Sequence, residues 1–210
     1  QFREWCAFAG LQAGDRYLIV NPFFHMFGYK AGWLAALLQG ATIVPVAVFD
    51  VPTVLSLVET ERITVLPGAP TVYRSILDHP ERKAFDLRSL RVAVTGAADI
   101  PVALIREMRA ELPFRPIFTG YGLTEAGTCT GSRPEDDAET IATTPGRAMD
   151  GLEIIIADSH GQEVERGATG ELLVRGYSVM QGYLDDPKAT AAAIDDRGFL
   201  HTGDLATMDE

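Results

Sequence analysis

Hydrophobic residues in the first 145 positions alternate between short continuous runs and positions with helical spacing. The short runs predict strands at residues 16–20, 41–48, 63–66, 90–94 and 117–118. The helical spacing predicts helices at residues 25–38, 51–62, 71–77 and 101–112, the first of them buried and ended by Gly40. Strands that alternate with helices are joined by right-handed crossovers, so this part of the chain is expected to be an α/β fold: a largely parallel sheet covered by helices.

The pattern changes after residue 145, where short β-rich runs are separated by many glycines. These runs lie at residues 152–157, 171–175 and around Phe199. They predict a small antiparallel β unit, either a sandwich or a barrel. We therefore expect an α/β subdomain over 1–145 and a β-rich, barrel-like subdomain over 146–210. The polar, acidic stretch 133–144 at their junction is predicted to be a surface loop.

The composition is that of an ordinary globular protein, with 47% hydrophobic residues. A net charge of −11 disfavours nucleic acid or an anionic membrane as the main partner, because both attract clustered lysine and arginine. The most apolar region, 31–49, is interrupted near Gly40 and at Pro45, so no transmembrane segment is expected. Because no signal peptide precedes the first elements, a cytoplasmic protein is expected, and Gln1 is interpreted as an internal residue.

Cysteine and histidine form no metal-binding pattern in this sequence. Cys6 and Cys129 are far apart, which favours two reduced thiols, although the proximity of Cys129 to Glu125 leaves a place in a pocket open. His25 lies in an apolar stretch, where a core histidine bonded to the backbone is the simplest interpretation. The remaining histidines, His79, His160 and His201, have no metal-ligand spacing.

The stretch TGYGLTEAGT, residues 119–128, places glycines around a tyrosine and sets the Thr124 hydroxyl beside the Glu125 carboxylate. An apolar run leads into it, so we expect the glycines where a buried strand ends, a place at which ligands of α/β proteins collect. The glycine spacing matches neither a dinucleotide fingerprint nor a P-loop. A hydroxyl and a carboxylate are groups that hold Mg²⁺ against a phosphate. A plain glycine turn with both side chains solvated explains the motif equally well.

Five motifs occur in a definite order: PFFHMFG, VAVTGAA, TGYGLTEAG, GELLVRG and HTGDLA. In that order they resemble the adenylate-forming superfamily, which includes acyl-CoA ligases, adenylation domains of peptide synthetases and luciferases. The resemblance runs from His25 to Asp204 and is closest to bacterial fatty-acid or sterol-fragment CoA ligases. No aspartate of the kind that grips the substrate amine in amino-acid adenylating domains is identified.

The resemblance implies an enzyme of lipid metabolism that uses ATP, Mg²⁺ and coenzyme A. A carboxylic acid would attack the α-phosphate of ATP to give an acyl adenylate, and the thiol of CoA would then take the acyl group. By resemblance, Thr124 hydrogen-bonds a phosphate oxygen and Glu125 binds Mg²⁺. Tyr121 would stack on adenine, while Gly120 and Gly122 would let the backbone come close to the nucleotide. An ordinary core aromatic is the alternative for Tyr121.

Three further positions receive roles from the same resemblance. Gly96, Ala97 and Ala98 correspond to a loop whose backbone runs along the adenine edge, where large side chains would block approach. Asp204 corresponds to a carboxylate that accepts hydrogen bonds from both ribose hydroxyls. His25 corresponds to a residue beside the acyl pocket and the pantetheine tunnel, so we interpret it as a gate or substrate-positioning residue. Plain turns and a core histidine are the corresponding alternatives.

The resemblance also implies parts that this chain does not contain. A glycine-rich loop ending in lysine would precede Gln1, and a small domain carrying the catalytic lysine would follow Glu210. No lysine of the chain, Lys30, Lys83 or Lys188, has a matching context. We therefore expect the chain to be the central part of an acyl-CoA ligase and to be inactive by itself.

Other interpretations stay open at this point. The chain could be a non-catalytic nucleotide-binding or acyl-binding remnant, an amino-acid or aryl-acid adenylating domain, or a luciferase-like oxidase. No pattern specifies the carboxylic acid or the oligomeric state.

Overall fold

A computed structural model describes residues 2–209, which form two compact units. The parallel-sheet unit contains the described residues up to Tyr121 together with Thr130–Arg147. The antiparallel unit contains Gly122–Cys129 and the described residues from Ala148 onward. The predicted division of the chain into subdomains at residues 145 and 146 stays a prediction.

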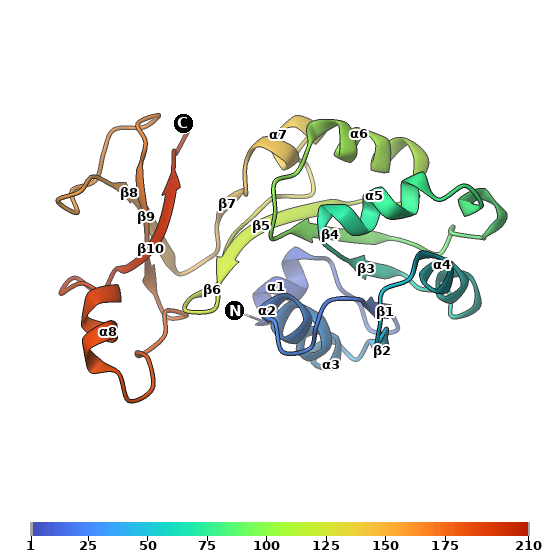
Figure 1. Ribbon diagram of the computed structural model, residues 1–210, viewed down its shortest axis with the longest axis horizontal. Helices are drawn as coiled ribbons and strands as arrows, with labels where there is room; N and C mark the ends of the chain where they lie inside the picture. Colours follow the sequence, from blue (N-terminus) through green and yellow to red (C-terminus); the bar gives the residue numbers. More distant parts are fainter. Residues whose placement is uncertain (1, 210) are drawn as a thin grey trace. The chain divides into compact units, whose positions relative to one another are not determined.

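A mostly parallel sheet organises the first unit, as the sequence pattern predicts (Figure 1). Its strands are β1 (Arg16–Ile19), β2 (Thr42–Pro45), β3 (Val65–Pro67), β4 (Val92–Gly96), β5 (Ile117–Leu123), β6 (Gly127–Gly131) and β7 (Arg147–Ala148). They are ordered β2-β1-β3-β4-β5-β6-β7, and each neighbouring pair from β2 to β5 is parallel. The final residues of β5, the first of β6 and the last of β7 belong to the antiparallel unit.

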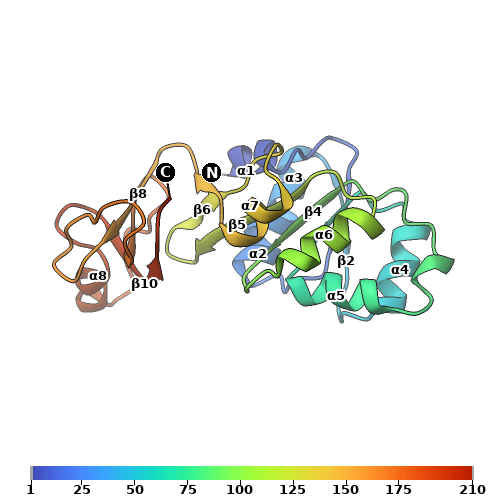
Figure 2. The ribbon, with the colours of Figure 1, turned by 90° about the horizontal axis from the view of Figure 1, so that it is seen from above.

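Helices cover both faces of the parallel strands. One core packs against α4 (Val51–Thr60), α5 (Pro70–Asp78), α6 (Val102–Glu111) and α7 (Ala138–Thr143). The other packs against α1 (Phe2–Phe8), η1 (Tyr29–Leu34) and α3 (Ala35–Gln39). Figures 1 and 2 both place α5 beside α6. Successive residues of a strand point to opposite faces, and accordingly Leu18 joins the first core while Tyr17 and Ile19 join the second.

Local signals explain where the helices of this unit begin. Asp50 accepts a hydrogen bond from the Thr53 N–H (3.0 Å) and caps α4. Asp137 caps α7 in the same way through the Thr140 N–H (2.8 Å). The prediction of a loop over 133–144 is therefore wrong for residues 138–143, where the cap and the buried Ile141 stabilise a short helix. A short 3-10 helix, η2 (Arg82–Ala84), follows α5.

The single buried helix predicted over 25–38 is also corrected. The segment consists of α2 (Met26–Gly28), the π-helical η1 and α3, with non-helical backbone at Gly32. A Cβ at Gly28 would lie 2.1 Å from the Pro22 carbonyl oxygen, so only glycine fits where α2 lies against the preceding turn. Leu37 and Leu38 are 60% and 49% exposed. The helical pattern is thus real, but it is broken and only partly buried.

The antiparallel unit contains a three-stranded sheet and one helix. The strands are β8 (Leu152–Ala157), β9 (Gly170–Gly176) and β10 (Leu200–Ala206), in the order β10-β9-β8, and the helix is α8 (Pro187–Ala193). Both strand pairs are antiparallel, as predicted. Three strands in this order form an open sheet rather than a closed barrel. Ile155, Ala157, Leu173 and Phe199 form its core.

No helix within residues 2–209 combines the length and the apolar character that crossing a membrane requires.

Candidate functional site

The glycines of the 119–128 motif lie inside strands, which corrects the predicted turn. β5 continues through Leu123, and the turn consists of residues 124–126. A Cβ at Gly120 would lie 2.6 Å from the Thr130 carbonyl oxygen, and one at Gly122 would lie 2.3 Å from the Gly127 carbonyl oxygen. Both contacts are too short for a side chain. These glycines therefore permit close approach of two backbones rather than a change of direction.

The turn between β5 and β6 presents the predicted hydroxyl and carboxylate. Thr124 is exposed, Glu125 is partly exposed, and the Ala126 N–H donates to the Leu123 carbonyl oxygen (3.3 Å). Gly127 follows with a φ of 72°, a conformation that glycine adopts without strain. Thr124 and Glu125 are thus adjacent on a compact turn. Their side chains can offer a hydrogen-bond donor to an anion and an oxygen ligand to a cation.

A distant segment of the same unit holds this turn. The Met180 N–H donates to the Glu125 carbonyl oxygen (2.7 Å), and the Ser178 hydroxyl donates to the Ala126 carbonyl oxygen (2.7 Å). The Tyr183 hydroxyl donates to Glu125 Oε1 (2.9 Å). This hydrogen bond to the carboxylate raises the pKa of Tyr183 above its ordinary value, which is already well above neutral pH. Tyr183 could not be predicted from the sequence, because no local signal links residues 58 positions apart.

The protein ligands available for Mg²⁺ are few. Residues 2–209 contain no group of three or more histidine, cysteine, aspartate or glutamate side chains arranged to hold a metal ion. Mg²⁺ in nucleotide sites is commonly bound by one or two carboxylates together with phosphate oxygens and water. The single carboxylate of Glu125 beside the Thr124 hydroxyl fits that kind of site. It does not fit a metal centre built from protein ligands alone.

Two parallel strands of the parallel-sheet unit bring other predicted residues together. Gly96, the last residue of β4, is in register with Gly120 of β5, and a Cβ at Gly96 would lie 3.2 Å from the Gly120 carbonyl oxygen. Ala97 follows with a φ of 62°, and both Ala97 and Ala98 are exposed. The partly buried Tyr121 donates its N–H to Thr130 Oγ1 (3.2 Å). The loop after β4 and the middle of β5 are therefore neighbours, at a strand end of the kind at which α/β proteins bind ligands.

Asp204 lies on β10, where the pairing with β9 is irregular between His201 and Leu205. The Glu171 carboxylate accepts the Gly203 N–H (3.0 Å), and its other oxygen lies 2.9 Å from His201 Nδ1. The Asp204 N–H donates to Thr202 Oγ1 (3.1 Å). Irregular strand pairing of this kind redirects side chains. Asp204 is exposed on this fixed backbone, and Glu171 is a second supporting residue that sequence analysis missed.

His25 is exposed, which corrects the interpretation of a core histidine. Its Nδ1 accepts the Phe27 N–H (3.1 Å), so the side chain caps α2. The neutral ring therefore carries its proton on Nε2. Phe23 and Phe24 next to it are 45% and 92% exposed. His25 is thus bonded to the backbone as expected, but at an apolar surface.

The two cysteines have no catalytic features. Cys129 is fully buried, and burial raises the pKa of its thiol to about 12. Burial also raises the pKa of Cys6. A thiol reacts as the thiolate, so a raised pKa lowers the reactive fraction of both residues at neutral pH.

The structure therefore brings together Gly96 and Gly120 in the parallel-sheet unit, and Thr124 and Glu125 in the antiparallel unit. His25 and Asp204 lie on other elements of these units. That all of them serve one nucleotide site stays a prediction.

Comparison with known proteins identifies many relatives. The family described as AMP-binding enzyme matches residues 2–184. The chain is 56% identical over 208 residues to the 3-[(3aS,4S,7aS)-7a-methyl-1,5-dioxo-octahydro-1H-inden-4-yl]propanoyl:CoA ligase of Rhodococcus jostii, covering 99% of this chain and 38% of that protein. It is 55% identical to the ligase of the same name from Mycobacterium tuberculosis, covering 99% of this chain and 39% of that protein. The chain thus spans less than two fifths of the length of these relatives.

Two of the solved structures that resemble this chain match it over its whole length. The N-terminal domain of FACL13 from Mycobacterium tuberculosis is similar with a TM-score of 0.89 and 28% identity, over 100% of this chain and 52% of that one. The amide bond synthetase McbA from Marinactinospora thermotolerans is similar with a TM-score of 0.88 and 32% identity, over 100% of this chain and 42% of that one.

Proposed function

The chain belongs to the AMP-binding enzyme family, and on that premise we propose that it is part of an ATP-dependent acyl-CoA ligase. Such a ligase activates a carboxylic acid as its acyl adenylate and then transfers the acyl group to coenzyme A. The observation that carries the proposal is the turn at 124–126, where consecutive residues carry a hydroxyl and a carboxylate on a backbone fixed by hydrogen bonds from a second segment. The names of the relatives support the same reaction.

Each predicted residue has a defined task in this proposal. The Thr124 hydroxyl donates to a phosphate oxygen, and Glu125 provides a carboxylate oxygen to Mg²⁺. When bound, Mg²⁺ reduces the repulsion between the polyphosphate and the incoming carboxylate. The loop from Gly96 to Ala98 would pass along the nucleotide with only the small, exposed side chains of Ala97 and Ala98, while Gly120 and Gly122 let β5 lie close against β6.

Two side chains complete the nucleotide contacts in this proposal. Tyr121 offers an aromatic face to adenine. The Asp204 carboxylate has two oxygens with which to accept the ribose hydroxyls.

We further propose an apolar, ring-bearing acid as the substrate class. The two relatives above are named for a propanoate that carries a methyl-dioxo-octahydroindene ring system. Exposed Phe23 and Phe24 beside His25 provide apolar surface of the kind such an acid requires. His25 would position the acyl group or gate its pocket. A cytoplasmic location stays a prediction.

The test uses the full-length protein that contains this chain. Thioester and AMP formation are measured with ATP, CoA and four acids: the bicyclic propanoate, a fatty acid, an aryl acid and an amino acid. We expect CoA-dependent turnover to be fastest with the bicyclic acid. Adenylation of the amino acid without CoA dependence would favour an adenylating domain instead, and no turnover with any acid would contradict the proposal.

The matched variants are Glu125→Gln and Glu153→Gln. Glu153 is exposed and pairs with Arg175 on the surface of the antiparallel unit. We expect Glu125→Gln to lower kcat/KM by about 100-fold, the usual cost of removing one electrostatic contact to a transition state. Glu153→Gln is expected to retain wild-type activity.

A further inference from the structure

The Glu125 side chain is held by one specific hydrogen bond. Among the described residues, the hydrogen bonds from Met180 and Ser178 reach backbone oxygens of the turn, whereas the one from Tyr183 reaches the carboxylate. The first two fix the position of the turn, whereas the third fixes the direction of a side chain. We propose that Tyr183 is a positioning residue that orients the Glu125 carboxylate for Mg²⁺ binding. This inference rests on the proposed function of Glu125.

The geometry divides the two carboxylate oxygens between two tasks. The Tyr183 hydroxyl occupies Oε1 at 2.9 Å, which leaves Oε2 of Glu125 for a cation. The terminal torsion of a glutamate side chain is soft, so without a partner the carboxylate samples many orientations. A neutral phenol restrains the carboxylate and leaves its negative charge intact. A lysine or arginine in the same place would cancel that charge. Partners that orient a metal ligand in this way commonly matter nearly as much as the ligand itself.

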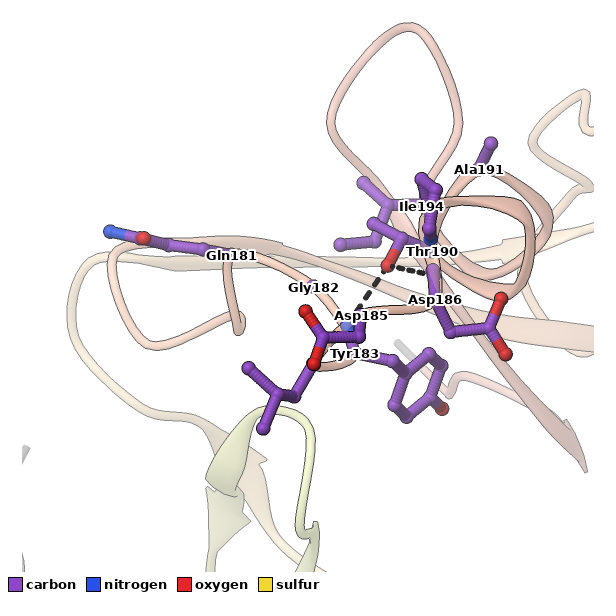
Figure 3. Close-up of a pocket in the computed structure, with 10 residues that line it drawn as sticks. Gln181, Gly182, Tyr183, Asp185, Asp186, Thr190, Ala191 and Ile194 are labelled. Atoms are coloured by element: carbon purple, nitrogen blue, oxygen red, sulfur yellow. Dashed lines mark hydrogen bonds between the residues drawn. The ribbon is translucent and has the colours of Figure 1, made fainter.

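Tyr183 is in turn fixed by helix α8 (Figure 3). Its N–H donates to Thr190 Oγ1 (2.9 Å), and the Thr190 hydroxyl donates to the Asp186 carbonyl oxygen (2.9 Å). The Asp186 carboxylate caps α8 by accepting the Ala189 N–H (2.9 Å). Gly182 has a φ of 153°, and a Cβ there would lie 2.8 Å from Thr190. A chain of hydrogen bonds therefore connects the N-terminus of α8, through Thr190, to Tyr183 and from there to Glu125.

The surroundings of Tyr183 agree with a supporting role. Tyr183 lines a pocket of about 650 Å³ together with Asp185, Asp186 and other residues between 181 and 194. Tyr183 is 42% exposed, so packing alone does not determine the orientation of its side chain. The hydrogen bond to Glu125 is the polar contact that gives the hydroxyl a defined direction.

The experiment compares Tyr183→Phe with Tyr177→Phe in the full-length protein. Both changes remove one hydroxyl from a partly exposed tyrosine of the antiparallel unit. ATP binding is measured by calorimetry without any acid, with Mg²⁺ and without it. We expect Tyr183→Phe to weaken the Mg²⁺-dependent gain in ATP affinity about tenfold. ATP affinity without Mg²⁺ should not change, and Tyr177→Phe should keep the Mg²⁺-dependent gain, because the hydrogen bond to the Glu125 carboxylate comes from Tyr183.

Two further variants test whether Tyr183 acts through Glu125. In a Glu125→Gln background, Tyr183→Phe should cause no additional loss, because the carboxylate that it orients is already gone. Thr190→Val keeps the side-chain shape and removes the support for the Tyr183 backbone, so we expect a smaller loss in the same direction.

The outcomes separate this inference from the proposed function. If Glu125→Gln loses the Mg²⁺-dependent affinity while Tyr183→Phe keeps it, the role of Tyr183 is overturned and the proposed function stands. If the wild-type protein shows no Mg²⁺-dependent ATP binding, the proposed function fails and this inference fails with it. Additive losses in the double variant would also overturn it, because Tyr183 would then act independently of Glu125.

Discussion

The two units position their candidate residues by different physical means. In the parallel-sheet unit, Gly96 and Gly120 are placed by strand register, and the absence of side chains lets neighbouring backbones lie close together. In the antiparallel unit, Glu125 and Asp204 are placed by irregular backbone and by single polar contacts from other segments. The first arrangement should be sensitive to added volume, and the second to the loss of one hydrogen-bonding atom.

The largest expected effect comes from adding volume to the parallel-sheet unit. Gly120→Ala places a Cβ 2.6 Å from the Thr130 carbonyl oxygen, which forces β5 and β6 apart. We expect the free energy of unfolding to fall by about 2 kcal/mol, as for other overpacked sites. Gly96→Ala is the matched control, because its Cβ would lie 3.2 Å from the Gly120 carbonyl oxygen and needs only a small adjustment. Equal denaturation midpoints for the two variants would contradict this account of the sheet.

A second, smaller effect is expected from removing a polar group in the antiparallel unit. Glu171→Ala removes the acceptor for the Gly203 N–H and the contact with His201, and so loosens the backbone that carries Asp204. The loss of hydrogen bonds worth about 1 kcal/mol each should raise the KM for ATP about tenfold and change kcat less. Glu165→Ala, a change at an exposed loop position, is the control for kinetics and thermal stability. An unchanged KM for ATP would mean that the irregular pairing does not serve the nucleotide.

The third prediction concerns Gly182, where added volume is expected to disturb a hydrogen bond as well. Gly182→Ala adds a Cβ 2.8 Å from Thr190 and should displace the hydroxyl that supports Tyr183. Gly167→Ala is matched to it, since Gly167 also has positive φ (82°) but no atom within 4 Å of the added Cβ. Both should lose about 1 kcal/mol of stability from backbone strain. Only Gly182→Ala should also weaken Mg²⁺-dependent ATP binding, and a similar loss in Gly167→Ala would mean that strain alone is responsible.

The same contrast explains which features the sequence could predict. Buried runs such as that of β4 and amphipathic spacing such as that of α6 depend on local periodicity, and the structure confirms both elements. The course of β5 through Gly120 and Gly122 was mispredicted because glycine locally favours turns, whereas pairing with β6 keeps the backbone extended here. The family was predicted from the order of five sequence motifs. The spacing of hydrophobic residues carries no such information.

The supporting residues could not be predicted because they depend on contacts between distant segments. Tyr183 and Glu125 are 58 positions apart, and Glu171 and Gly203 are 32 positions apart. The residues around each of these four positions contain no pattern that predicts the contact. Motifs thus led to a prediction of which groups contact a ligand, while the groups that orient them could be identified only from the fold.

The smallest expected effect compares two aspartates that accept backbone hydrogen bonds in different settings. The pKa of Asp50 is lowered by hydrogen bonds from Thr53 at the start of α4, and that of Asp158 by the N–H groups of Gln162 and His160 in a turn of the antiparallel unit. Because each folded pKa lies below the unfolded value of about 3.9, each carboxylate stabilises the fold above that pH. This stabilisation is lost as the pH falls from about 3.9 through the lowered pKa.

Asparagine keeps a hydrogen-bond acceptor but does not titrate in this range, so Asp50→Asn and Asp158→Asn should each flatten the acid part of the stability profile. At neutral pH the two variants should differ. Asp50→Asn also loses the attraction between a negative charge and the N-terminus of α4, whereas Asp158 has no helix to act on. Urea unfolding midpoints across the acid range, at low and high salt, measure both effects. If Asp158→Asn costs as much as Asp50→Asn at neutral pH, local turn geometry rather than the helix dipole determines the contribution of these carboxylates.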